Sequence, residues 1–113
     1  MTHVVAEPCV NCRYTDCVEV CPVDAFRAGE NCLVIDPREC IDCTLCVSQC
    51  PVGAIFADGD LPERWSEWLA LNDRLSTRWP IIRKKIAPLS GHENAARLLE
   101  KRELLSERPE HGL

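Results

Sequence analysis

With 113 residues the chain is long enough for one small domain, and its net charge of −5 does not favour a nucleic-acid binder. Its nine cysteines stand out, because at about eight per cent of the chain they approach the range that indicates cross-linking or metal binding. The N-terminus lacks the basic and apolar regions of a secretory signal, and no apolar run approaches the roughly 20 residues that span a bilayer. We therefore expect a cytoplasmic protein, with no membrane partner, whose thiols bind metal rather than form disulfides.

Charge and residue type divide the chain into two unlike parts. Residues 1–63 carry 11 acidic and 3 basic residues, whereas residues 64–113 carry 7 acidic and 10 basic ones, which gives −8 and +3. All cysteines lie between Cys9 and Cys50, and all three tryptophans follow residue 63. This predicts a cysteine-built head over residues 1–60 and a helical C-terminal extension over residues 61–113 that packs on it, together forming a single domain.

The head is expected to hold short strands at three places, Val4-Val5, Leu33-Val34-Ile35 and the segment 54–57. The sequence Cys-Pro-Val-x-Ala occurs at residues 21–25 and returns 29 residues later at residues 50–54. Such a repeat predicts two related half-domains, each with a cysteine loop, a short helical turn and a strand. Short strands with helices added after them predict an α+β fold.

The extension is expected to form two helices. Asp60 and Glu63 resemble a capping box with Pro62 in the first turn, so a helix should run from about residue 62 to 78. Its apolar positions fall on one face: Trp65, Trp68, Leu69, Leu75 and Trp79. A second capping box at Ser90–Glu93 predicts another helix that reaches about Ser106.

The second cysteine run has the regular spacing Cys40-x2-Cys43-x2-Cys46-x3-Cys50-Pro, which is used to hold cubane iron–sulfur clusters. The last cysteine of such a run is carried past a helical turn and ligates the other cluster. Cys21, which is also followed by proline, is the reciprocal partner. Cys21, Cys40, Cys43 and Cys46 are therefore the expected ligands of a [4Fe–4S] cluster.

The first run, Cys9-x2-Cys12-x4-Cys17-x3-Cys21-Pro, has two extra residues between its second and third cysteines. The insertion should displace Cys12 and leave Cys9, Cys17 and Cys50 as ligands, which favours a [3Fe–4S] cluster. If the loop rearranged, Cys12 would instead become a fourth ligand.

Two further residues near these runs have open roles. Asp16 directly precedes Cys17, so it is a candidate proton acceptor. The alternative, which we give equal weight, is an ordinary solvated carboxylate in the loop. Cys32 lies in an expected strand, and packing is its simplest role.

Residues 9–24 (CVNCRYTDCVEVCPVD), 31–37 (NCLVIDP) and 39–43 (ECIDC) resemble the bacterial seven-iron ferredoxins, and residues 71–80 resemble their C-terminal extension. The resemblance implies a pseudo-twofold, ferredoxin-like head with antiparallel strands that holds one [3Fe–4S] and one [4Fe–4S] cluster. It implies a monomeric electron carrier, not an enzyme, that serves redox proteins such as a ferredoxin reductase and an electron-accepting enzyme. Ala25 stands where some relatives have another cysteine.

A rival of another class is a zinc-stabilised interaction module whose tail, with the basic cluster at residues 83–85, binds a protein or nucleic acid. Zinc ribbons use two pairs of cysteines separated by a spacer, whereas the second run places three cysteines in a continuous rhythm. The spacing therefore favours a cluster over zinc.

Overall fold

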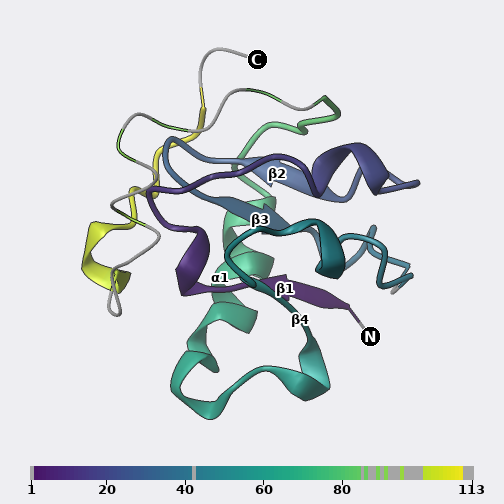
Figure 1. Ribbon diagram of the computed structural model, residues 1–113, viewed down its shortest axis with the longest axis horizontal. Helices are drawn as coiled ribbons and strands as arrows, with labels where there is room; N and C mark the ends of the chain where they lie inside the picture. The colour runs from purple at the N-terminus through teal and green to yellow at the C-terminus, as the bar shows by residue number, and fades with distance from the viewer. Residues whose placement is uncertain are drawn as a thin grey trace.

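The computed structural model describes residues 2–41, 43–84, 86, 89, 91, 95 and 101–110. Its strands form two antiparallel pairs (Figure 1). In one pair, β1 (His3–Val5) lies against β4 (Ile55–Ala57), with Val5 opposite Ile55. In the other, β2 (Phe26–Ala28) lies against β3 (Leu33–Ile35), with Phe26 opposite Ile35. The architecture is α+β, with short antiparallel strands as expected.

The three strands expected in the head are confirmed, and β2 is an addition. The sequence of β2, Phe-Arg-Ala, is too short and too polar in its middle to indicate a strand. It is held by partners far along the chain: besides β3, the Ala28 N–H donates to the Pro80 carbonyl at 2.9 Å, and Ile82 N–H donates to the Phe26 carbonyl at 3.2 Å. Tertiary contacts therefore decide its conformation.

The helix α1 (Glu67–Ser76) crosses behind β1 and β3 and contacts both strands (Figure 1). Trp68 and Leu75, which are fully buried, pack it onto the core around Phe26 and Leu33. No α-helix in the described part of the chain is long and apolar enough to cross a membrane.

The expected start of this helix at about residue 62 is wrong, whereas its end at Ser76 lies close to the expected residue 78. Asp60 belongs to a separate 3-10 turn (Asp58–Asp60) followed by extended backbone at Leu61, so it cannot cap the helix. A second 3-10 turn (Glu63–Trp65) precedes α1, and no side chain caps either element. The expected apolar face is also wrong at Leu69, which is 43% exposed. Asn72, by contrast, is buried in the helix interface.

Most of the second expected helix lies outside the described residues, but its expected end at Ser106 does not. Lys101 has a non-helical φ of −135°, a 3-10 turn spans Arg102–Leu104, and Leu105 is extended. The helix therefore does not continue to Ser106. The Lys101 N–H donates to the Glu7 carboxylate at 3.1 Å, so it makes a tertiary contact.

Candidate metal centres

The C-terminal parts of the two cysteine loops share the same local backbone geometry. Cys17 and Cys46 each lead into a 3-10 turn, Val18–Val20 and Val47–Gln49, with nearly equal φ of −67° and −70°. Each turn ends at an extended cysteine, Cys21 or Cys50, which is followed by proline.

These two cysteines also share a hydrogen bond. The Ala25 N–H donates to Cys21 Sγ and the Ala54 N–H donates to Cys50 Sγ, both at 3.3 Å. The chain can return to donate in this way because Asp24 and Gly53 adopt positive φ of 53° and 62°. A backbone N–H aimed at sulfur favours the charged thiolate, which is the form that binds metal.

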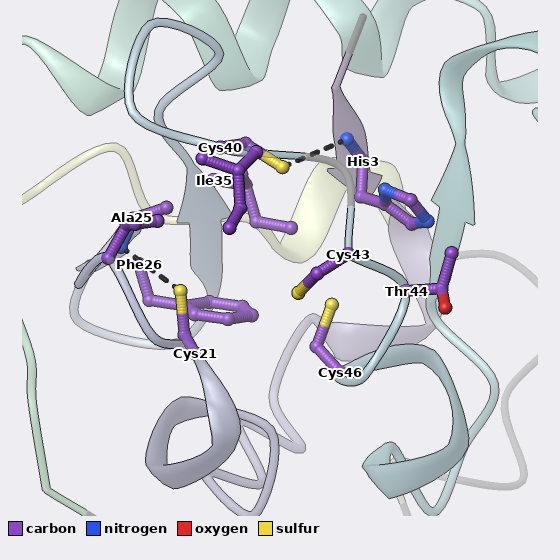
Figure 2. A pocket seen from close by; sticks show the side chains of 11 residues that line it. His3, Cys21, Ala25, Phe26, Ile35, Cys40, Cys43, Thr44 and Cys46 are labelled. Carbon is purple, nitrogen blue, oxygen red and sulfur yellow. Dashed lines mark hydrogen bonds between the residues drawn. The ribbon is translucent and has the colours of Figure 1, made fainter.

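Four of the predicted ligands line one pocket (Figure 2). They come from both loops: Cys21, Cys40, Cys43 and Cys46. The sulfur atoms of Cys21, Cys43 and Cys46 face the middle of the pocket, and that of Cys40 lies beside the His3 N–H, which donates to it at 3.5 Å. The apolar rings and chains of Phe26 and Ile35 complete the lining.

Electrostatics within this group disfavour several thiolates at once. Burial, followed by repulsion from Cys40, Cys43 and Cys21, raises the pKa of Cys46 to about 12. Without bound cations, therefore, Cys46 remains a neutral thiol at ordinary pH. Iron would remove this penalty because its positive charge compensates the thiolates.

The other three predicted ligands also lie near one another. Burial, followed by repulsion from Cys9 and Cys50, raises the pKa of Cys17 well above its ordinary value. Cys9 and Cys17 are buried, and Cys50 is half-buried. Cys17 therefore interacts electrostatically with both other predicted ligands of the first cluster.

All nine cysteines are free thiols, so the donor chemistry of both groups fits an iron–sulfur cluster. Among the described residues, no three His, Cys, Asp or Glu side chains lie close enough to hold a single metal ion. Thiolates on one zinc ion, at about 2.3 Å each, would all lie within about 4.6 Å of one another. Cluster ligands are further apart because iron and sulfide atoms separate them.

Cys12 is fully buried and faces a cation. Lys101 Nζ lies 3.4 Å from Cys12 Sγ and donates to the Pro8 carbonyl at 2.6 Å. Burial raises the pKa of Cys12, and the Lys101 ammonium opposes part of that rise. The contact with Lys101 was not predictable from the sequence, in which the two residues are 89 positions apart.

Cys32 is fully buried, in keeping with a packing role, but it also lies beside Cys9. A hydrogen bond from the Cys32 thiol holds the pKa of Cys9 below its ordinary value despite burial. Cys32 itself has its pKa raised well above the ordinary value, chiefly by burial. Cys32 therefore remains neutral next to a predicted ligand.

Asp16 is half-buried directly before Cys17. Its role as a proton acceptor stays a prediction.

Sequence reasoning missed Asn72, which connects the strands beneath both loops. Its Oδ1 accepts from the N–H groups of Val5 at 3.1 Å and Ile35 at 2.9 Å, and its Nδ2 donates to the carbonyls of Val5 and Trp68. A polar residue within the apolar face of α1 is the signal that could have identified it. All four hydrogen bonds are buried, so this side chain fixes the spacing of β1 and β3.

Comparisons with known proteins agree with this donor chemistry. Residues 33–56 match the family described as 4Fe-4S binding domain, and residues 66–107 match a domain of unknown function, DUF3470. The chain is 46% identical to Ferredoxin-1 of Caulobacter vibrioides over 113 residues, which cover 99% of both chains. It is 55% identical to a ferredoxin of Rickettsia felis over 67 residues, 59% of this chain and 62% of that one. The chain belongs to the ferredoxin family and is an iron–sulfur electron carrier, not an enzyme.

Proposed function

We propose that this ferredoxin carries one [3Fe–4S] cluster on Cys9, Cys17 and Cys50, and one [4Fe–4S] cluster on Cys21, Cys40, Cys43 and Cys46. The observation that carries the first assignment is the position of Cys12. Its sulfur is fully buried against the Lys101 ammonium, so three thiols remain for the first cluster. The pocket lined by the other four thiols supports the second.

Each cluster would then join the two loops, because Cys21 and Cys50 each leave their own loop. The matching turns before these cysteines and the matching N–H···S bonds after them support a pseudo-twofold head over residues 1–60. Residues 61–113 form the extension in this proposal, and α1 within it packs on β1 and β3.

When bound, each cluster can accept and release one electron at a time. The chain's own contribution is to set how easily this happens. Backbone N–H groups of His3, Ala25 and Ala54 donate to candidate ligand sulfurs, which stabilises added negative charge. Burial of Cys9 and Cys17 acts in the opposite direction, because a buried site is poorly solvated.

The proposed role is to pass single electrons between redox proteins, namely a ferredoxin reductase and an electron-accepting enzyme, as a cytoplasmic monomer. The −8 charge of residues 1–63 supports partners with basic docking faces. Binding to them should weaken as salt is added.

Anaerobic purification followed by iron analysis and electron paramagnetic resonance tests the cluster assignment. An oxidised [3Fe–4S] cluster is paramagnetic and an oxidised [4Fe–4S] cluster is silent, so we expect about seven irons per chain with a signal before reduction. About eight irons and a silent oxidised protein would contradict the three-iron assignment. A colourless protein with zinc and no iron would contradict both clusters.

A further inference from the structure

The segment 101–110 crosses over the first cysteine loop, and its first residue is Lys101 (Figure 1, yellow beside purple). Lys101 is 3% exposed, which is unusual for a lysine. Its ammonium donates to the Pro8 carbonyl and to Cys12 Sγ, and both acceptors belong to the loop that carries the first predicted ligand, Cys9. The segment therefore brings a buried cation into direct contact with the loop.

Lys101 is held in place by its backbone as well as by its side chain. Its N–H donates to Glu7 Oε2 at 3.1 Å, and Glu7 is itself buried. Further along, Asn31 donates from Nδ2 to the Leu104 carbonyl at 2.8 Å and accepts from the Ser106 N–H at 2.9 Å. The lysine side chain thus starts from a fixed point on the head.

A buried ammonium needs all the acceptors available to it, because loss of one partner leaves part of its charge unsolvated. Rotation of Cys12 toward Cys9, Cys17 and Cys50 would remove one of the two acceptors that Lys101 Nζ contacts among the described residues. Recruitment of Cys12 as a cluster ligand is therefore opposed by a contact outside the loop, in addition to the insertion within it.

We propose that Lys101 is a positioning residue that holds Cys12 away from iron and so keeps the first cluster in its three-iron form. This gives the segment that matches the domain of unknown function a specific task. The inference rests on the proposed function, since it presupposes the [3Fe–4S] assignment.

The test is Lys101→Met in the full chain, purified anaerobically beside the wild type. Met keeps an unbranched apolar chain and removes the ammonium. We expect iron content to rise by about one iron per chain and most of the oxidised three-iron signal to be lost, as Cys12 completes a cubane. Arg102→Met, which removes the neighbouring half-exposed cation, is the matched control and should keep the wild-type iron content and signal.

The double variant Lys101→Met/Cys12→Ala decides whether the effect passes through Cys12. It should regain the wild-type three-iron signal. If the signal stays lost in the double variant, or if Lys101→Met alone keeps it, the inference is overturned. Should Lys101→Met not fold, Lys101→Gln takes its place and the same two results are required.

The proposed function and the role of Lys101 are contradicted by different results. A wild-type protein without the three-iron signal contradicts the proposed function. A wild type with the signal, together with a Lys101→Met variant that is indistinguishable from it, contradicts only the role of Lys101.

Discussion

The two cysteine loops end in the same backbone turn but have very different surroundings. In the first loop Cys9, Cys12 and Cys17 are all buried, and segment 101–110 lies against it. In the second loop Ile41 is 59% exposed and Leu45 is 54% exposed. The repeated cysteine sequence therefore sets the local turn, whereas the extension sets how far each loop is shielded from solvent. The second loop is therefore the more exposed of the two.

Loss of the clusters should have the largest effect, since it acts on both cysteine loops at once. Because the proposed ligand sets cross between the loops, removal of iron should release both loops together and unfold the head. We expect anaerobic chelation to abolish the cooperative thermal transition observed by circular dichroism. Addition of iron and sulfide is the control and should restore it. Persistence of a cooperative transition in the iron-free protein would show that the clusters do not join the loops.

The next effect concerns the polar contact beneath both loops. Asn72→Ala should lower the free energy of unfolding by about 3 kcal/mol, because buried backbone groups of Val5 and Ile35 lose their partner. Asp73→Ala, one residue along the same helix, removes a side chain that is 58% exposed and should cost less than about 1 kcal/mol. Chemical denaturation of the iron-loaded proteins gives both values. Equal losses would mean that the bridge between β1 and β3 contributes little.

A smaller effect is expected where Trp79 of the extension packs against Gly29 of the head. A Cβ on Gly29 would lie 2.4 Å from the Trp79 ring, so Gly29→Ala must displace a large buried side chain. We expect a loss of about 2 kcal/mol in the free energy of unfolding. Gly59→Ala is the matched control, because nothing lies within 4 Å of its added Cβ. If both glycines tolerate alanine equally, Trp79 is less firmly held than its burial indicates.

The smallest effect concerns a surface ion pair within the extension. Arg74 contacts Glu107 at 2.6 Å with both side chains more than 40% exposed, so Glu107→Gln should cost only about 0.5 kcal/mol at neutral pH. The hydrogen bond from Arg74 lowers the pKa of Glu107, so its stabilisation is present above the unfolded-state pKa.

That stabilisation should disappear as the pH falls through the folded-state pKa, where Glu107 becomes protonated. The free energies of unfolding of the wild type and of Glu107→Gln, measured from neutral to acidic pH at low salt, should therefore converge. Glu103→Gln, at an exposed position in the same segment, controls for the change in net charge. A difference between the two free energies that grows on acidification would contradict a lowered pKa of Glu107.

Short apolar strands were predictable because their β-branched and aromatic residues pack against partners that share the same pattern. The strand β2 has no apolar pattern of its own because Arg27 interrupts it, and β2 bonds to residues 80–82 as well as to β3. The start of α1 was misjudged because a capping box is a local signal, and the chain before Leu61 is committed to a different turn.

The seven candidate ligands follow from the spacing of the cysteines and stay a prediction, and four of them line one pocket. The environment of those ligands could not be predicted. Lys101 reaches Cys12 across 89 residues, and nothing in the sequence around Lys101 indicates a buried position. Asn72 can be recognised in the sequence as a polar residue on an apolar helix face. Its partners on β1 and β3 could be identified only from the structure.

Cys12 is the residue that most directly decides whether the two proposed clusters differ in iron content. Cys12→Ala should retain about seven irons per chain and the full oxidised three-iron signal, whereas Cys17→Ala should lose that signal. The measurement is iron content with electron paramagnetic resonance of the oxidised wild type and both variants. A wild type that is silent, with a three-iron signal that arises only when Cys12 is removed, would show that Cys12 is a ligand and would contradict the account.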